Sequence, residues 1–268
     1  MRIGLITPEP EHPLLAAATA LLTPEHVVEA LDPLAPGTVP LPLADVYLLK
    51  SRTPAALGLA RYLERRGAPV VNSASATALC QDRTRMAELA LEAGLPFAAT
   101  LTHDSFATWA AAAPDLPSPV VVKSRLSRRG DLVARVDDAD RLRELAAAWP
   151  REPVVVQDFA PNSGWDHKLW AIGDRLFAAV RRSELAPGGR GPTLPLPPAE
   201  LPPGWASVVR KVGAVFGLDV YGVDLIDAGA GSPLIVDINA FPGIRGQDGA
   251  PEALAALALR RAAGGPHA

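Results

Sequence analysis

The chain has 268 residues, a formal net charge of −3 and 49% hydrophobic residues, which is enough apolar content to bury a large core in two or three subdomains. The mild acidity argues against a nucleic-acid partner, for which a basic face is expected. No apolar run approaches the roughly 18 residues of a membrane span, so no membrane association is expected. Met1–Thr7 has the pattern of a first strand, not of a signal peptide. We therefore expect a cytoplasmic protein.

The first 82 residues alternate strand and helix patterns. Three apolar runs predict strands, at Arg2–Ile6, Asp45–Leu49 and Pro69–Asn72. A fourth segment, Pro54–Arg66, predicts a helix. These elements predict a small βα domain, in which ligands gather at the carboxyl ends of strands. Lys50, Ser51 and Arg52 directly follow the second strand, so they either line a ligand site or lie in a solvated turn.

A second block of elements follows Asp82, which suits the N-cap of a helix. The predicted elements are a helix at Met86–Ala93, a strand–loop–strand unit at Ser118–Val136, a helix at Asp138–Trp149 and an apolar strand at Pro153–Gln157. Lys123 ends a run of valines, where a buried ammonium needs either phosphate oxygens or a structural salt bridge as its partner. The loop after it holds three arginines, Arg125, Arg128 and Arg129. This loop either contacts phosphate or carboxylate groups or forms a solvated hairpin tip.

The next elements are a hairpin, a loop and two helices. The hairpin runs from Asp166 to Arg182 and turns at Gly173–Asp174. Residues 183–204 are rich in Pro and Gly and predict a loop without regular structure. The predicted helices are Trp205–Phe216 and Ala250–Ala263.

Two hydrophobic strands between the last two helices each carry a carboxylate. Their alternation suits a hairpin whose polar positions share one face, so we expect Asp224, Asp237 and Asn239 to converge. Hard oxygen ligands on a rigid sheet, with room for water and phosphate oxygens, are what Mg²⁺ requires. The alternative is a surface hairpin with solvated acids, but uncompensated polar side chains in a core-like run are costly. The pattern therefore predicts a magnesium site, with Mn²⁺ as the alternative ion.

The spacing of Asp224, Asp237 and Asn239, followed by Phe241–Gly243, resembles the metal-binding end of the ATP-grasp superfamily. The likeness is closest to two branches, the ribosomal-protein glutamate ligase type of carboxylate–amine ligase and the inositol trisphosphate kinases. It implies an α/β fold of α+β subdomains, an ATP-grasp fold preceded by an N-terminal βα pre-ATP-grasp domain. The implied division is 1–82 for the pre-ATP-grasp domain, 83–160 for the small or lid subdomain and 161–268 for the C-terminal subdomain with the metal hairpin.

The resemblance also implies roles for five cations. Arg83 stands where the family usually has a lysine that reaches ATP phosphates, and Lys123 stands where a second cation contacts them. Lys168 and Arg182 match two further cationic positions, one contacting phosphate and the other stabilising the transferring phosphoryl group. Arg181 is expected on the other face, and a slip of one residue in the strand register would exchange the two arginines.

The strand Pro153–Gln157 resembles the one that leads into the family's hinge, where backbone groups bind the adenine edge and a nearby acidic side chain holds the ribose. On this basis we assign Gln157, Asp158, Phe159 and Ala160 to ATP binding.

The implied function is ATP-dependent carboxylate–amine ligation through an acyl phosphate, with release of ADP and phosphate. The alternative is a kinase that phosphorylates a hydroxyl, such as that of an inositol phosphate. A hydroxyl must lose a proton whereas a carboxylate is already a nucleophile, and no residue is clearly placed as the base, which favours the ligase. The expected partner is a small-molecule or peptide acceptor, and a homo-oligomer is left open. The Arg/Asn/His pattern of the glutamate ligases is not found in residues 183–204, so the substrate is also left open.

Two other classes are disfavoured. A regulatory module that binds ATP without catalysis is disfavoured because all the expected metal ligands, Asp224, Asp237 and Asn239, are present, and such a module does not need them. A dinucleotide-binding enzyme would show Gly-x-Gly-x-x-Gly after Arg2–Ile6, and the sequence has none there.

Overall fold

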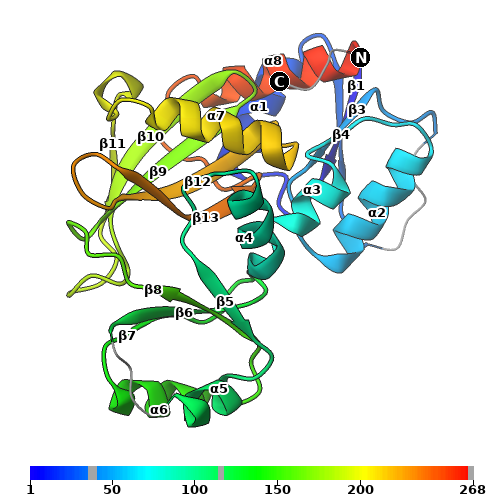
Figure 1. Ribbon diagram of the computed structural model, residues 1–268. Helices are drawn as coiled ribbons and strands as arrows, with labels where there is room; N and C mark the ends of the chain where they lie inside the picture. Colours follow the sequence, from blue (N-terminus) through cyan, green and yellow to red (C-terminus); the bar gives the residue numbers. More distant parts are fainter. Residues whose placement is uncertain (36–40, 114–117, 265–268) are drawn as a thin grey trace.

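The computed structural model describes residues 1–35, 41–113 and 118–264. The described residues form three sheets with helices packed on their faces, as Figure 1 shows, and the predicted α/β class is confirmed. Within these residues, no helix is both long and apolar enough to cross a membrane.

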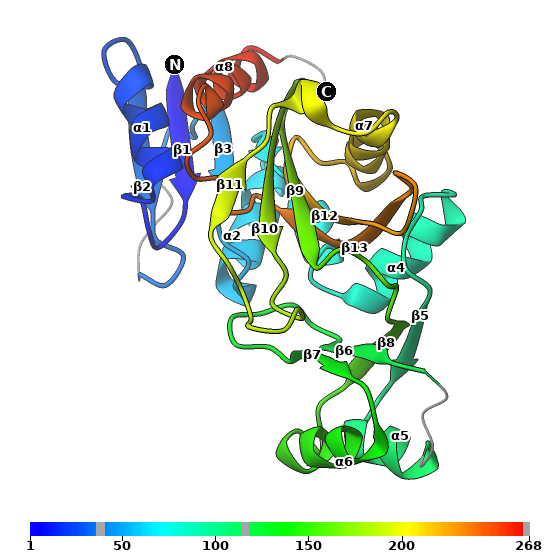
Figure 2. The same cartoon turned by 90° about the vertical axis from the view of Figure 1, so that its left-hand side faces the viewer.

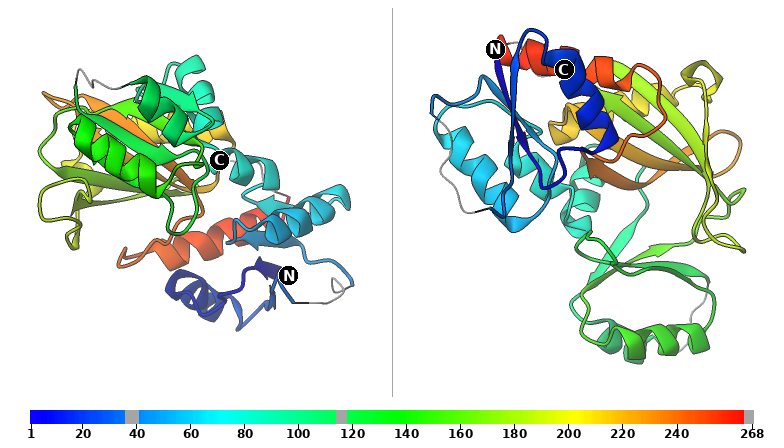
Figure 3. Two further views of the ribbon diagram at one scale, coloured as in Figure 1. Left: turned by 90° about the horizontal axis from the view of Figure 1, so that it is seen from below. Right: turned by 180° about the vertical axis from the view of Figure 1, so that it is seen from behind.

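The first sheet is parallel, with the strand order β2-β1-β3-β4. Its strands are β1 (Arg2–Ile6), β2 (Val27–Leu31), β3 (Val46–Leu49) and β4 (Val70–Val71). Its helices are α1 (Pro13–Leu22) and α8 (Ala250–Ala262) on one face and α2 (Pro54–Arg65) on the other, as Figures 1 and 3 show. Ile3 and Leu5 pack toward α1 and α8, whereas Ile6 packs toward α2, because side chains alternate along a strand. The loops after β1 and β3 leave the sheet at the same edge.

The second sheet is antiparallel and small, with the order β5-β8-β6-β7. Its strands are β5 (Thr100–His103), β6 (Val120–Ser124), β7 (Val133–Val136) and β8 (Val154–Asp158). Helices α5 (Phe106–Ala112) and α6 (Ala139–Ala148) cover the outer face, where Val120 and Val122 enter a common core with Val154 and Val156. Figure 2 shows that the opposite face of this sheet turns toward the third sheet.

The third sheet is antiparallel, with the order β11-β10-β9-β12-β13. Its strands are β9 (Trp165–Ile172), β10 (Arg175–Arg182), β11 (Thr193–Pro195), β12 (Val220–Asp227) and β13 (Pro233–Ala240). Helices α3 (Ala74–Leu79), α4 (Arg83–Glu92) and α7 (Trp205–Phe216) pack around one core with this sheet. Trp205, fully buried, is the largest side chain in that core.

Two sequence expectations change in the structure. Residues 183–204 were expected to lack regular structure, and this is wrong in part: β11 pairs with β10, and a 3₁₀ turn at Pro198–Glu200 follows. An edge strand tolerates proline because one of its sides makes no ladder bonds. Helix α4 begins at Arg83 instead of Met86, because the Asp82 side chain accepts bonds from the amides of Thr84 and Arg85.

The division at residues 82 and 160 stays a prediction, and the packing links the parts across it. Helix α4, expected in the small subdomain, belongs to the core of the third sheet. Helix α8, expected in the C-terminal subdomain, packs against the first sheet and shares its core with Ile172, Phe177 and Val220 of the third.

Candidate active site

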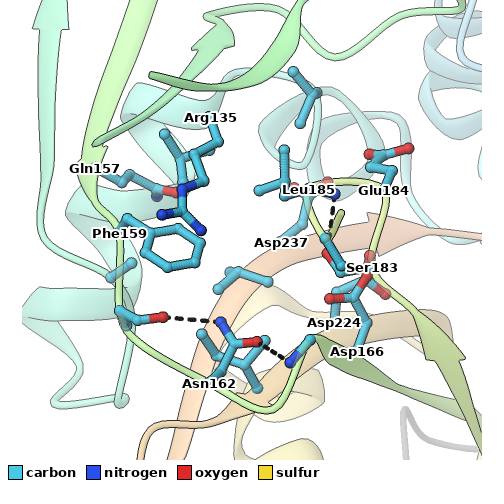
Figure 4. Close-up of a pocket in the computed structure, with 18 of the residues that line it drawn as sticks. Arg135, Gln157, Phe159, Asn162, Asp166, Ser183, Glu184, Leu185, Asp224 and Asp237 are labelled. Atoms are coloured by element: carbon cyan, nitrogen blue, oxygen red, sulfur yellow. Dashed lines mark hydrogen bonds between the residues drawn. The ribbon is translucent and has the colours of Figure 1, made fainter. Parts of the chain in front are cut away.

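A cavity of about 710 Å³ lies between the second and third sheets. In Figure 4, Arg135 and Gln157 stand on one side of it and Asp224 on the other. Ten of the predicted site residues line the cavity: Arg83, Lys123, Gln157, Asp158, Phe159, Ala160, Lys168, Arg182, Asp224 and Asp237. The other two, Arg181 and Asn239, are outside this lining.

A row of charged side chains crosses the third sheet. Lys168 of β9 pairs with Asp224 of β12, which pairs with Asp237 of β13, and directly opposed residues of antiparallel strands share a face. The Lys168 Nζ lies 2.6 Å from an Asp224 carboxylate oxygen and 3.6 Å from one of Asp166. Asn239 follows two residues after Asp237 and therefore lies on the same face. The expected convergence is present, whereas the role of these residues as metal ligands stays a prediction.

The oxygen donors of this row fit a hard divalent cation. Mg²⁺ is usually held by one or two carboxylates and fills its other positions with water and substrate phosphate. Among the described residues, no group of three or more His, Cys, Asp or Glu is placed to hold a metal ion. Burial raises the pKa of the Asp224 carboxyl, the Lys168 ammonium opposes this shift, and Asp237 adds to it. A divalent cation between Asp224 and Asp237 would offset their repulsion.

A β-bulge connects Lys123 to the same strand. The register of β12 and β13 shifts between Asp224 and Leu225, which leaves Val236 without a partner across the ladder. The Lys123 Nζ donates to the Val236 carbonyl at 2.7 Å. Lys123 is only 6% exposed, and burial lowers the pKa of its ammonium to about 8 although Asp237 opposes the shift. A buried ammonium beside the cavity is a ready partner for phosphate oxygens.

Arg83 bonds with protein groups on two sides. Its guanidinium donates to the Ser124 carbonyl at 2.8 Å and to the Asp131 carboxylate at 2.6 Å, and it lies 3.6 Å from Asp237. It therefore ties α4 to the β6–β7 loop and to β13. The expected contact of Arg83 with ATP phosphates stays a prediction.

Two arginines of the β6–β7 loop are held by carboxylates. Arg125 is 2.9 Å from Asp82, and Arg128 is 2.7 Å from Glu152. In this conformation these two ion pairs fix the loop to α4 and to the segment before β8.

The register of β9 and β10 reverses the expected faces of two arginines. Arg181 pairs with Asp166, so it shares the face of Lys168, and Arg182 lies on the other face. The Arg181 guanidinium lies 3.8 Å from Asp166 and is 12% exposed. Arg182 is exposed, borders the cavity and donates to the Pro187 carbonyl. The expected strand faces of the two arginines are therefore wrong, whereas Arg182 does border the cavity as expected, and the catalytic role of either arginine stays a prediction.

The end of β8 turns one backbone edge toward the cavity. The Phe159 amide donates to the Pro119 carbonyl at 3.0 Å, on the side of β6. Backbone groups of successive residues point to opposite edges of a strand, so those of Asp158 and Ala160 point away from β6. Pairing with β5 ends at Gln157, so this edge continues beyond the last β5 residue. Asp158 and Ala160 thus present backbone groups where an adenine edge could pair.

Arg135 is a cavity residue that the sequence reasoning missed. Its guanidinium carbon lies 3.9 Å from the centroid of the Phe159 ring, and Figure 4 shows the two groups facing each other. It also forms an ion pair with Asp137 at 2.6 Å. The available signal was a lone cation in the otherwise apolar strand Val133–Val136. Asp166 was missed as well, because an acid at the start of a strand resembles a solvated turn residue.

Comparisons with known proteins agree with this geometry. The family model of the RimK-like ATP-grasp domain matches residues 81–255. A protein named probable alpha-L-glutamate ligase from Legionella pneumophila (strain Corby) is 28% identical over 229 residues, covering 78% of this chain and 72% of the relative.

Solved structures show the same fold. A RimK domain ATP-grasp protein from Sphaerobacter thermophilus has a TM-score of 0.71 at 23% identity and covers 96% of this chain and 99% of its own. The D-alanine–D-alanine ligase of Bacillus anthracis has a TM-score of 0.72 at 16% identity and covers 98% and 99%. These likenesses confirm the predicted ATP-grasp fold.

Proposed function

Because this chain belongs to the family of RimK-like ATP-grasp domains, we propose that it is an ADP-forming ligase that joins a carboxylate to an amine. The observation that carries the proposal is the row of Lys168, Asp224 and Asp237, which faces a cavity lined on another side by Lys123. This arrangement surrounds phosphate-binding space with both cations and hard oxygen ligands. The names of the relatives, a probable glutamate ligase and a D-alanine–D-alanine ligase, support carboxylate–amine ligation.

ATP is proposed to occupy the cavity with its adenine at the backbone edge of Asp158 and Ala160. Its phosphates would then extend toward Lys123 and Lys168, whose ammonium groups neutralise charge on the phosphate oxygens. Asp224, Asp237 and Asn239 would hold Mg²⁺, which supplies further neutralisation of that charge when bound.

The proposed reaction has two steps. A carboxylate oxygen of the acceptor attacks the γ-phosphorus, the bond to the bridging oxygen breaks, and ADP leaves. The amine then attacks the acyl carbon, inorganic phosphate leaves with the bonding electron pair, and the amine loses a proton. Lys123 and Lys168 position the phosphates and stabilise charge in the first step, which needs no base because the carboxylate is already ionised.

The candidates for a hydroxyl-activating base are poorly placed, which disfavours the kinase alternative. His167 is on the opposite face of the third sheet, where its ring packs edge-on against Trp205 with centroids 4.7 Å apart. The Asp166 carboxylate lies 3.6 Å from the Lys168 ammonium and 3.8 Å from the Arg181 guanidinium, so it is engaged in ion pairs on both sides. The acceptor is proposed to be a small molecule or a peptide, and the cytoplasmic location and a homo-oligomer remain predictions.

Trapping with hydroxylamine tests the reaction type. The full chain is incubated with Mg-ATP, hydroxylamine and a panel of N-acetylated amino acids and N-acetylated short peptides, none of which carries a free α-amino group. A ligase gives a hydroxamate together with ADP, because hydroxylamine intercepts the acyl phosphate. Asp237→Asn serves as the inactive control. A stable phosphate ester that accumulates in step with ADP would refute the ligase proposal.

A further inference from the structure

Three loops meet at the carboxyl edge of the first sheet. β1 and β3 are parallel neighbours, so residues 7–12 and 50–53 leave the sheet side by side. The segment after β13 joins them, because the Phe241 ring lies 5.7 Å from the Lys50 Nζ. A Cβ placed on Gly243 would come within 3.4 Å of the His12 Nε2. The proposed ligand Asp237 and the strand end Ala240 are three residues apart, about 10 Å along an extended strand.

Three cationic side chains gather at this junction, which we term the cationic junction: Lys50, Arg52 and Arg245. Burial, with Lys50 and Arg245 adding to the effect, lowers the pKa of the neighbouring His12, so its imidazole is uncharged at neutral pH. The Lys50 amide donates to the Ile6 carbonyl, but among the described residues the side chains of Lys50 and Arg245 make no hydrogen bond or ion pair, and the Lys50 ammonium stands over the Phe241 ring. Burial lowers the pKa of Lys50 to about 8, Arg52 and Arg245 add to this shift, and Glu9 opposes it. The Glu9 carboxylate is thus the one acidic group set against the three cations Lys50, Arg52 and Arg245 in this balance.

His12 and the start of α1 add a second, independent observation. His12 is the N-cap of this ten-residue helix but makes no capping hydrogen bond through its side chain. It is only 8% exposed, and its Nδ1 has no hydrogen-bond partner among the described residues. An uncapped helix start presents free amides and the positive end of the helix dipole, which favour an anion.

The backbone at Phe241 is strained where it enters the junction. Phe241 has φ of 43°, a left-handed conformation that a bulky side chain rarely adopts and that costs on the order of 1–3 kcal/mol. This conformation follows directly after the strand of Asp237 and Asn239 and holds the ring against Lys50. Such strain persists where the surrounding structure enforces it, as at ligand sites.

We propose that the cationic junction binds a second anionic group of the acceptor, so that the acceptor carries a carboxylate or a phosphate besides the carboxylate that is activated. This inference rests on the proposed ligase function and names its substrate class. The Arg245 guanidinium can grip such a group through two parallel bonds while Lys50 contributes a point charge. A neutral acceptor would leave these cations without a counter-charge.

Competitive labelling of amines tests the proposal without ATP. The full chain is treated with a trace of acetic anhydride near the pKa of Lys50, and peptide mass spectrometry gives the labelling rate of each lysine. The probes are glutarate and inorganic phosphate, compared with chloride at equal ionic strength. We expect glutarate or phosphate to slow the labelling of Lys50 severalfold and to leave that of the exposed Lys211 unchanged.

Two variants and the identity of the better probe complete the test. Arg245→Ala should abolish the protection, whereas Arg61→Ala, which removes an exposed arginine on α2, should preserve it. Stronger protection by glutarate indicates a carboxylate, and stronger protection by phosphate indicates a phosphate group. Equal protection by chloride, protection that survives Arg245→Ala, or a Lys50 that cannot be labelled at all would each overturn the proposal. If the hydroxamate assay failed, the protection of Lys50 from labelling could still be interpreted, because the labelling needs no turnover.

Discussion

Replacing Lys50 with methionine removes a charge that becomes partly dehydrated on folding. Burial, with Arg52 adding to the effect, lowers the pKa of Lys50 from 10.5 to about 8. A lowering of about 2.5 pH units at about 1.4 kcal/mol each means that the charged form costs about 3 kcal/mol of folding free energy at neutral pH. Methionine keeps an apolar stem beside Phe241 but loses the cation–π contact, worth about 0.5–2 kcal/mol. We expect Lys50→Met to raise the free energy of unfolding by about 1–2 kcal/mol.

The pH dependence gives this effect a distinctive sign. The unfolded chain keeps the Lys50 proton up to about pH 10.5, whereas the folded chain releases it near pH 8. In that window the unfolded state binds more protons, so the Lys50 contribution makes the parent protein more stable as the pH rises from about 8 to about 10.5. The advantage of Lys50→Met should therefore be largest below pH 8 and vanish near pH 10.

Urea denaturation of parent and variant at neutral pH and near pH 10 measures this difference. Arg61→Met, on the exposed side of α2, controls for the general effect of removing one positive charge. If Lys50→Met were less stable than the parent at neutral pH, or if the difference did not change with pH, dehydration of the Lys50 charge would not govern the stability of this site.

Three further predictions concern the active site. Asp237→Asn should abolish ADP formation while circular dichroism shows an intact fold, since a lost metal ligand costs several kcal/mol in the transition state; near-parental turnover would refute the metal assignment. Lys123→Met should raise the KM for ATP more than the KM for the acceptor, and an unchanged KM for ATP would contradict its place beside the phosphates. Arg181→Ala should lower kcat more than Arg182→Ala does, because only Arg181 shares the face of Lys168; steady-state kinetics showing the reverse order would refute this reasoning and give the larger role to Arg182, which borders the cavity.

The face of Arg181 could have been predicted from the sequence. The predicted turn at Gly173–Asp174 is confirmed, and a two-residue turn pairs Ile172 with Arg175. Counting back from that pair places Arg181 opposite Asp166. The wrong face came from family resemblance, which aligns residue types but does not determine strand register.

Strongly patterned elements were predictable, and weakly patterned ones were not. Helix Trp205–Phe216 has a clear apolar face and a glycine after its end, and its bounds are as predicted. Helix α1 was missed because eight of its ten residues are Ala or Leu, so no polar face marks a period. Strand β2 was missed because its residues are half-buried or exposed and do not alternate.

The bulge at Val236 was visible only in hindsight. Ile235 and Ile238 are both fully buried in one core although they are three residues apart, which an unbroken alternation of period two cannot achieve. The bulge inserts Val236 as an extra residue, which shifts the alternation by one position so that Ile235 and Ile238 face the same core. The contact of Lys123 with the Val236 carbonyl joins residues 113 positions apart, and no local pattern predicts such a pairing.

Helix α8 has a consequence for how the protein is made. Its side chains fill the core against Ile3 and Leu5 of β1, at the opposite end of the chain. While the ribosome is still adding residues 250–262, the β1 face that α8 will cover stays open to water, since α1 covers only part of it. The core of the first sheet can therefore be completed only after α8 has been synthesised. Until then its apolar face is a surface that a chaperone can hold and that a neighbouring nascent chain can bind.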